Sequence, residues 1–494
     1  MSKSESASMA NLPAGGGDIG LIGLAVMGQN LILNLADHGY HVVAYNRTTA
    51  TMHDFVDPLP EGTSISGAET IEELVAGLAS PRKIMLMVQA GRAVDAVIDA
   101  LVPLLEAGDV IIDGGNTNFP DTQRRADALG EKGILYVGTG VSGGEEGARH
   151  GPSLMPGGHR DAWPLIKEMF QSIAAKTDAG DPCCDWVGDG GAGHFVKMVH
   201  NGIEYGDMQL IAESYDFMGN LLGMDNRAMA KTFGDWDRGE LDSYLIEITA
   251  EILAFEDEEG PVIDRILDKA GQKGTGKWTG ITALQLGVPL TLIGEAVFAR
   301  ALSAMKEERV RAEGVLHGPT IAPLEQDGSW VEALGEALFA AKIVSYAQGY
   351  MLMREAASEY GWSLNYGGIA QMWRGGCIIR SAFLDRIKAA FDTDAELPNL
   401  LLDDWFRARV QAAQDGWRRT LAAGLTHGLP MPATSAALAF YDGYRRGRLP
   451  ANMIQAQRDY FGAHTWQHIG GSPDWHHTDW IGSGGLVSSS AYDA

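Results

Sequence analysis

Cysteine is scarce in this chain, which has three cysteines among 494 residues. Two of them, Cys183 and Cys184, are neighbours, so the set supplies neither a disulfide framework nor the ligand spacing of a zinc site. Such sparing use of cysteine is typical of a reducing compartment, and we expect a cytoplasmic protein. Long apolar runs are also missing, because none approaches the roughly 20 residues of a membrane-spanning helix.

Positive charge is low as well. The chain carries 38 lysines and arginines against 64 aspartates and glutamates, a formal net charge of −26. This balance argues against nucleic acid and anionic membranes as partners. Residues 1–17 are rich in Ser, Ala and Gly, without arginine or an apolar stretch. They predict a flexible extension rather than a secretory signal or a transit peptide.

Short apolar segments then alternate with helical patterns, which is typical of a doubly wound, Rossmann-like α/β domain with a parallel sheet. We assign this domain to residues 18–192. The pattern predicts helices at 29–38 and 94–105 and strands at 18–22, 41–45, 83–88, 110–113 and 134–137.

The strand signals fade after the glycine-rich run 187–193, and long amphipathic stretches take over. These predict a large all-α domain for substrate binding and dimerisation over residues 193–465, with helices near 241–256, 293–308 and 330–359. Residues 466–494 are rich in Gly, Ser, His and Trp and show no periodicity, so they predict an extended C-terminal tail.

A glycine-rich turn between the first strand and the first helix predicts a dinucleotide site. In this variant of the fingerprint, glycine allows the tight turn and close helix–strand packing, and N–H groups at the helix N-terminus receive the pyrophosphate. The turn consists of Gly23, Leu24, Ala25, Val26, Met27 and Gly28.

The end of the second strand favours NADP over NAD. An NAD site places a carboxylate there to bind the ribose 2′-OH, but this chain has Asn46, Arg47 and Thr48. Arg47 can pair with a 2′-phosphate and stack on adenine, although a solvated surface arginine is the alternative. Val88, Gln89 and Ala90 follow the next strand and complete the expected cofactor loops.

Lys197, His200, Asn201 and Glu204 recur at i, i+3, i+4 and i+7 and so share one face of a predicted helix. Their flanking residues are apolar and can pack into a core. A lysine and a glutamate two turns apart in one pocket predict a general base and a general acid. The alternative is a surface ion pair, for which a spacing of seven is too long.

Polar groups also follow two later strands, at the edge where ligands of such sheets bind. Asn116 follows one strand, and Ser142, Gly143 and Gly144 follow the next. These loops suit a polyhydroxylated ligand. Further along, basic residues stand at Lys273, Arg300 and Arg458, but their spacing alone selects no phosphate site.

Six blocks together resemble the 6-phosphogluconate dehydrogenases, the decarboxylating enzymes of the pentose phosphate pathway. The resemblance runs in order from about Asp18 to the C-terminus. It rests on residues 23–28, 140–149, 151–158, 194–205, 271–278 and 457–464.

The resemblance implies NADP-dependent oxidative decarboxylation of 6-phosphogluconate to ribulose 5-phosphate, without a metal. Lys197 would be the base for the C3 hydroxyl and then polarise the 3-keto group, and Glu204 would protonate C1 of the enediol. Sugar hydroxyls and carboxylate would contact Asn116, Ser142, Gly143, Gly144, His200 and Asn201. The phosphate would contact Tyr205, Lys273, Arg300 and Arg458, with His464 nearby.

The resemblance also implies a homodimer, in which Arg458 and His464 come from the second subunit and the tail threads through its partner. Gln89 departs from the family, which commonly has lysine there, and this bears on the strength of NADP preference. Three alternatives stay open: a β-hydroxyacid dehydrogenase that does not decarboxylate, a non-catalytic scaffold, and a metal site formed by residues 474–479 of the tail.

Overall fold

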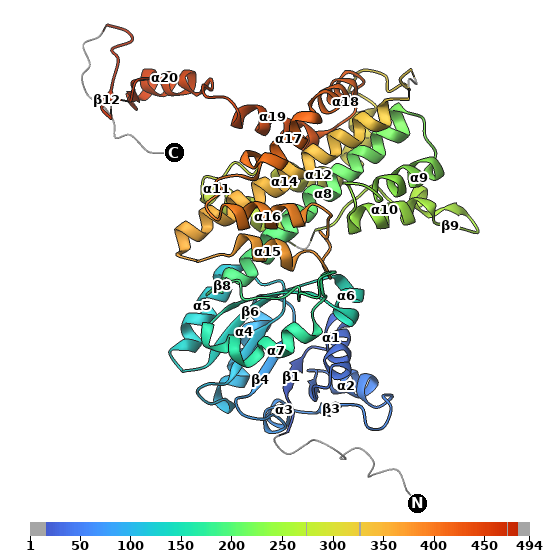
Figure 1. Cartoon of the computed structure of the whole chain (residues 1–494), viewed down its shortest axis with the longest axis vertical. Helices are drawn as coiled ribbons and strands as arrows, with labels where there is room; N and C mark the ends of the chain where they lie inside the picture. Colours follow the sequence, from blue (N-terminus) through green and yellow to red (C-terminus); the bar gives the residue numbers. More distant parts are fainter. Residues whose placement is uncertain (1–15, 273, 326–327, 472, 483–494) are drawn as a thin grey trace, which may run out of the picture. The chain divides into compact units, whose positions relative to one another are not determined.

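A computed structural model describes residues 16–482 except 273, 326–327 and 472. Its N-terminal part is an eight-stranded sheet in the order β3-β2-β1-β4-β5-β6-β7-β8 (Figure 1). The strands are β1 Ile19–Ile22, β2 Val42–Tyr45, β3 Ile65–Ala68, β4 Lys83–Leu86, β5 Val110–Asp113, β6 Leu135–Ser142, β7 Ser153–Gly158 and β8 Gly188–Asp189.

The predicted Rossmann-like domain is confirmed, and the sheet is mixed rather than wholly parallel. Strands β2, β1, β4, β5 and β6 pair in parallel, as the alternating pattern predicted. Strand β3, which the sequence pattern did not predict, adds a further parallel strand beside β2. Strand β7 is antiparallel to β6, with Ser142 opposite Ser153. No alternation of polar and apolar residues marks β7, because this strand is buried along its whole length.

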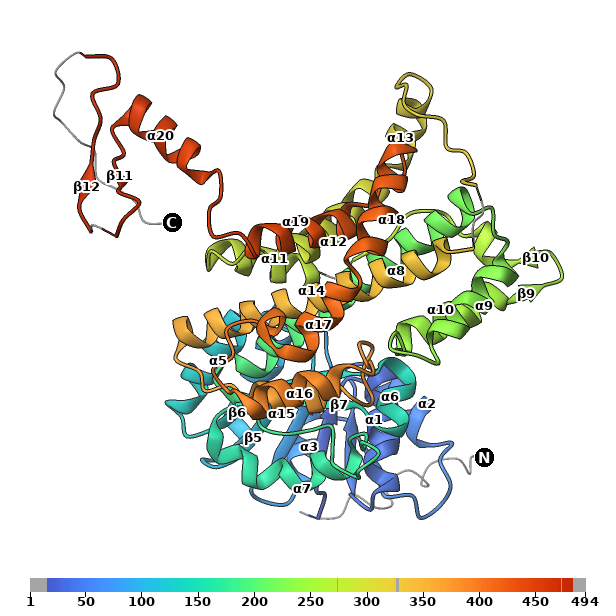
Figure 2. The same cartoon turned by 45° about the horizontal axis from the view of Figure 1, so that its top comes forward.

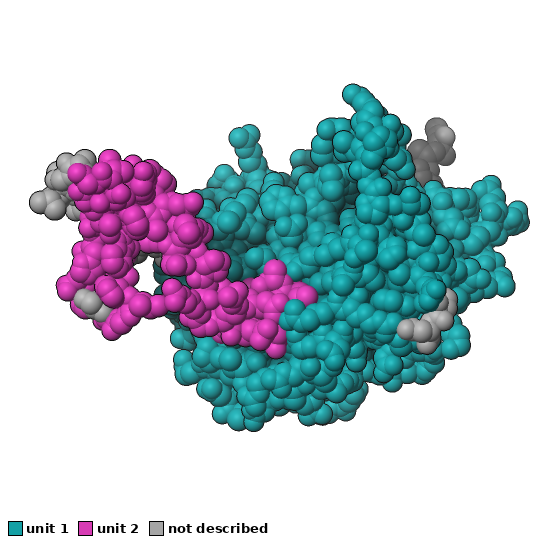
Figure 3. All heavy atoms as spheres, turned by 90° about the horizontal axis from the view of Figure 1, so that it is seen from above, with its two compact units in different colours: residues 1–436 teal, residues 437–494 magenta. Residues whose placement is uncertain are grey.

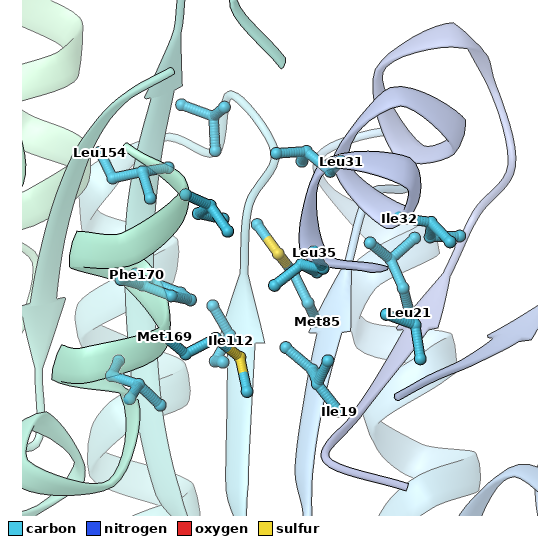
Figure 4. Packing of buried hydrophobic residues seen from close by; sticks show 14 of the residues in the cluster. Ile19, Leu21, Leu31, Ile32, Leu35, Met85, Ile112, Leu154, Met169 and Phe170 are labelled. Carbon is cyan, nitrogen blue, oxygen red and sulfur yellow. The ribbon is translucent and has the colours of Figure 1, made fainter. Parts of the chain in front are cut away.

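Two layers of apolar side chains hold helices against this sheet. On one face, Leu31 and Leu35 of α1 (Val26–Asp37) pack with Leu21, Met85 and Ile112 of the strands (Figure 4). Their complete burial explains why the central strands read as continuous apolar runs. The remaining helices of this part are α2 Thr49–Val56, α3 Ile71–Ala76, α4 Arg92–Leu101, α5 Phe119–Gly130, α6 Gly144–His150 and α7 Trp163–Ile173.

The chain from residue 192 onward is largely helical, as predicted. Its two longest helices, α8 (Ala192–Leu221) and α14 (Trp330–Tyr360), run side by side (Figures 1 and 2). The others up to the end of this bundle are α9 Asn226–Trp236, α10 Tyr244–Ala254, α11 Thr275–Gln285, α12 Thr291–Ser303, α13 Lys306–Glu313, α15 Tyr366–Met372, α16 Leu384–Thr393, α17 Asp404–Ala412 and α18 Gln414–Thr426.

A buried ion pair joins the two long helices. Lys342 of α14 donates to Asp207 of α8 over 2.8 Å, and both side chains are at most 1% exposed. Ser243 lies 3.5 Å from the same ammonium group. Because neither charge reaches water, each depends on the other for its solvation.

The structure divides into two compact units after Ala436, within α19 (Pro432–Tyr444) (Figure 3). The second unit contains α20 (Ala451–Gly462) and a two-stranded ladder of β11 (Trp466–Gln467) and β12 (Trp475–His476). Asp459 is buried within this unit and accepts from His477, Trp480 and the backbone N–H of Thr465. No helix among the described residues is long and apolar enough to span a membrane.

Candidate active site

Helix α8 carries the predicted catalytic stripe and begins against the sheet. A Cβ on Gly193 would lie 2.3 Å from the carbonyl oxygen of Gly138, and one on Gly140 would lie 2.4 Å from Cβ of Lys197. Larger residues would therefore force the helix away from β6. This close approach places Lys197 directly beside the strand that ends at Ser142.

The polar stripe is buried along with the apolar flanks of the helix. Lys197 is 6% exposed, His200 0% and Asn201 9%, and the Glu204 side chain is 22% exposed. The surface ion-pair alternative does not hold, because Lys197 is out of solvent. Four functional groups thus cluster along one largely buried face of α8.

His200 is the centre of the polar contacts. Its Nδ1 lies 2.9 Å from Oδ1 of Asn201, 3.5 Å from Nζ of Lys197 and 3.9 Å from Oε2 of Glu204. Its Nε2 lies 3.1 Å from Oγ of Ser142. The ring therefore connects the end of β6 to the catalytic stripe.

Burial moves the pKa values of the stripe in the directions that acid–base chemistry needs. It lowers the pKa of Lys197, against the opposing charge of Glu204. It raises the pKa of Glu204, against the charges of Lys197 and Arg300. Burial, helped by the Lys197 charge, holds the pKa of His200 well below its ordinary value, so this imidazole is neutral.

Tyr205 and Arg300 form the cationic side of the site. The guanidinium of Arg300 lies 3.5 Å from the centre of the Tyr205 ring and donates to the carbonyl of Gly271. Gly276 packs against the same ring, since a Cβ there would lie 2.5 Å from it. The segment on either side of Lys273, a predicted phosphate contact, therefore reaches Tyr205, while Lys273 itself lies outside the described residues.

The first turn of the sheet fits a dinucleotide. Gly23 has φ +106°, and a Cβ on Gly28 would lie 2.0 Å from the carbonyl oxygen of Gly23. The N-terminus of α1 has no side-chain cap and no acidic residue in its first turn, so its N–H groups are available to an anion. Met27 packs at the edge of the core beneath this turn.

The remaining cofactor residues lie on neighbouring loops. Asn46 accepts from the backbone N–H of Leu24, and Arg47 next to it is exposed. Met87 donates to the carbonyl of Ile22, which brings the loop of Val88, Gln89 and Ala90 beside the first turn.

A buried network fixes the loop that carries Asn116. Asp113 is fully buried and accepts from Thr117 over 2.7 Å and from Tyr136 over 2.9 Å. Arg125 lies 3.5 Å from the same carboxylate and also donates to the carbonyl of Gly91. The network leaves Asn116 exposed at the carboxyl edge of the sheet, where ligands of this fold bind.

Two predicted residues lie in the second unit. Arg458 is on α20 and donates to Gln455, and His464 follows the helix, its ring 6.0 Å from that of Phe461. The alternative of a metal site at residues 474–479 has no support among the described residues, which contain no cluster of three metal-binding side chains.

Sequence reasoning missed Cys377 and Arg125. The sulfur of Cys377 lies 2.7 Å from Nε2 of His200, although 177 positions separate the two residues. No local pattern marks either residue, because each reaches the site through tertiary packing. Cys377 is a single cysteine that follows two glycines, and Arg125 is an arginine within a helix. Neither setting indicates a functional residue.

Family models match nearly the whole described chain. The "NAD binding domain of 6-phosphogluconate dehydrogenase" matches residues 18–188, and the "6-phosphogluconate dehydrogenase, C-terminal domain" matches residues 193–480. Relatives named "6-phosphogluconate dehydrogenase, decarboxylating" include those of Ovis aries, 61% identical, and Homo sapiens, 60% identical. Each alignment covers 97% of this chain and 99% of the relative.

A solved structure has the same fold. The 6-phosphogluconate dehydrogenase of Plasmodium falciparum, described with its cofactor NADP+ and its substrate 6-phosphogluconate, superposes with a TM-score of 0.90 at 43% identity. The match covers 94% of this chain and 100% of that one.

Proposed function

We propose that the buried stripe of α8 performs acid–base catalysis on 6-phosphogluconate, because the chain belongs to the 6-phosphogluconate dehydrogenase family. The protein is an NADP-dependent oxidoreductase that converts 6-phosphogluconate to ribulose 5-phosphate and CO2. The observation that carries the residue assignment is the burial of Lys197 and Glu204 on one face of α8, with opposite pKa shifts.

Lys197 acts first as the base. Its lowered pKa makes the unprotonated amine more accessible near neutral pH, and this amine takes the proton of the C3 hydroxyl. As C3 gives up its hydride, for which bound NADP would be the acceptor, the C3 oxygen becomes a carbonyl. The ammonium of Lys197 then donates to that carbonyl oxygen. Electron density from the breaking C1–C2 bond flows toward that carbonyl, so the carboxylate leaves as CO2.

Glu204 supplies the last proton. Its raised pKa keeps a larger share of the carboxyl protonated, and it delivers the proton to the enediol carbon that lost CO2. Its position two turns along the helix from Lys197 allows the two groups to address different atoms of one extended substrate.

The remaining residues of the site bind and orient the substrate. Ser142, His200 and Asn201 present polar groups in the same pocket as Lys197. The cation of Arg300, held over Tyr205, suits the phosphate at the far end of the sugar acid. We place Asn116, Gly143, Gly144 and Lys273 in this set as well, on the strength of the family resemblance.

NADP, when bound, supplies the hydride acceptor at C3. The turn 23–28 would hold its pyrophosphate, Asn46, Arg47 and Thr48 would surround its adenosine end, and Val88, Gln89, Ala90 and Asn116 would line its course. The open N-terminus of α1 and the exposed guanidinium of Arg47 support this assignment.

We also infer a cytoplasmic homodimer in which Arg458 and His464 serve the site of the other subunit. Support comes from the apolar side chains on the outer surface of α11 and α12, where Leu284 is 83% and Phe298 69% exposed. An apolar face of this kind is typical of a subunit interface.

Substrate comparison tests the proposal against the rival dehydrogenase. We expect kcat/KM for 6-phosphogluconate to exceed that for gluconate and for 3-hydroxyisobutyrate by at least about a thousandfold, because both lack the phosphate that Arg300 binds. Equal or better turnover of either unphosphorylated acid would favour a non-phosphorylated substrate. Absence of any turnover would favour the scaffold alternative.

A further inference from the structure

The segment that ends at Cys377 reaches His200 from the far side of the stripe. Gly376 has φ +58°, and its carbonyl accepts from the backbone N–H of Ser153 over 2.8 Å. A Cβ on Gly143 would lie 2.6 Å from the same carbonyl oxygen. The turn is thus fixed against β7 and the substrate loop, and it directs the Cys377 side chain to the imidazole.

The proton on the His200 ring is assigned by its neighbours. Asn201 Nδ2 donates to Oγ1 of Thr275 over 3.1 Å, which leaves Oδ1 facing Nδ1 of His200 over 2.9 Å. A carbonyl oxygen accepts only, so Nδ1 carries the single proton of the neutral ring. Nε2 is then an acceptor, and it needs a donor because it is buried.

Two donors compete for that one lone pair. The Cys377 sulfur lies 2.7 Å and the Ser142 oxygen 3.1 Å from Nε2. Burial raises the pKa of the Cys377 thiol to about 12, against the Lys197 charge and a hydrogen bond from Ser142, so the thiol keeps its proton and remains a donor. The other charged groups facing the ring are Lys197 and Glu204, both on its Nδ1 side.

We propose that Cys377 is a positioning residue whose thiol donates to Nε2 of His200, fixes the Nδ1–H tautomer and leaves the Ser142 hydroxyl free to donate to the substrate. The inference rests on the proposed function in treating Ser142 and His200 as substrate contacts. Without the thiol, the Ser142 hydroxyl turns to Nε2 and is lost to the ligand. Trp373, which meets the ring edge-on, limits the motion that could compensate.

The test is a set of cysteine variants with binding and kinetics measured separately. We expect C377A to weaken 6-phosphogluconate binding, measured calorimetrically without cofactor, by about 3- to 10-fold, the worth of one hydrogen bond. The KM for NADP should stay within about twofold, because, among the described residues, the polar and ring contacts of His200 involve none of the residues 23–28, 46–48 and 88–90. C377S keeps a donor and should restore binding to within about twofold of wild type.

The matched control is C184A, which removes another fully buried thiol from the sheet side of the structure. It should leave substrate binding unchanged. Substrate binding by C377S as weak as that by C377A, or undiminished binding by C377A, would overturn the inference. A wild-type protein that neither binds nor oxidises 6-phosphogluconate would instead overturn the proposed function.

Nitrogen NMR of the wild-type protein gives a readout that does not depend on how the cysteine variants fold. With histidines labelled by ¹⁵N and the His200 signals identified by their loss in H200N, we expect a neutral ring protonated on Nδ1. A proton on Nε2 would make the thiol an acceptor and would contradict the proposal.

Discussion

Lys197 and Glu204 lie two turns apart on one face of α8, and burial shifts their pKa values toward each other. Catalysis needs the lysine as free amine and the glutamate as acid, which is the reverse of their ordinary states at neutral pH. Each pKa unit by which the two values approach raises the population of this form about tenfold. Burial of both side chains therefore favours the two protonation states that catalysis needs.

Replacing Lys197 by methionine should lower kcat by about 10² to 10⁴, the usual worth of a general base. Binding of 6-phosphogluconate should weaken far less, because the methionine keeps most of the aliphatic volume. The control is K167M, which replaces an exposed lysine on α7 and should keep full activity. Substantial turnover by K197M in stopped-flow assays would remove Lys197 from the chemistry.

The raised pKa of Glu204 makes a prediction about stability. Because the folded pKa lies above the unfolded one, the favourable contribution is present below about pH 4.3 and is lost as pH rises through the folded value. E204Q cannot ionise, so its melting temperature should exceed that of wild type at neutral pH and match it near pH 4. E168Q, which replaces an exposed glutamate, should show no pH-dependent difference in melting temperature from wild type. A difference between E204Q and wild type that is the same at pH 4 and at neutral pH would contradict the raised pKa of Glu204.

Arg47 should determine much of the cofactor choice. We expect R47A to lower kcat/KM with NADP by about 10-fold or more, because it removes a charge-assisted contact to the 2′-phosphate worth about 1.5–3 kcal/mol. The same variant assayed with NAD is the internal control and should change little. An equal loss with both cofactors would mean that Arg47 supports the loop rather than the phosphate.

Removing one partner of the Lys342–Asp207 ion pair should lower the free energy of unfolding strongly. K342M leaves Asp207 buried without a partner, and we expect a loss of about 3–5 kcal/mol in the free energy of unfolding. The double variant K342M/D207L, which removes both charges, should recover most of the lost free energy of unfolding. K231M, which breaks an exposed pair with Asp235, should cost less than about 1 kcal/mol in urea denaturation.

Subunit complementation tests the dimer and the role of Arg458 together. If Arg458 serves the partner's site, a mixed dimer of K197M and R458A contains one site with both wild-type residues. Random reassociation of equal amounts makes half of the dimers mixed, and each mixed dimer has one competent site of its two. About a quarter of wild-type activity should therefore be restored. No recovery, with dimers present by light scattering, would place Arg458 in its own subunit's site.

The sequence predicted those parts of the site that lie on single elements. The stripe from Lys197 to Glu204 needs only helical periodicity, and the turn 23–28 needs only its place between a strand and a helix. Strand 110–113 has the predicted bounds, since its residues are buried on both faces. Local patterns sufficed in each case.

What the sequence could not predict depends on contacts between distant segments. Cys377 meets His200 only because the Gly376 turn packs on β7, and Arg125 reaches Asp113 and Gly91 only after α5 docks on the sheet. The antiparallel β7 was also missed, because a buried glycine-rich strand has no alternation to detect. Arg458 and His464 were placed by family resemblance, and their role stays a prediction.

Oxidative decarboxylation releases two products, reduced nicotinamide and CO2, that can be measured in one reaction. Purified protein is given 6-phosphogluconate with NADP or NAD, and reduced nicotinamide and CO2 are measured in parallel. We expect rapid reduction of NADP with equimolar CO2, and slower reduction of NAD. Reduced nicotinamide without matching CO2, or no reduction with either cofactor, would contradict the proposed function.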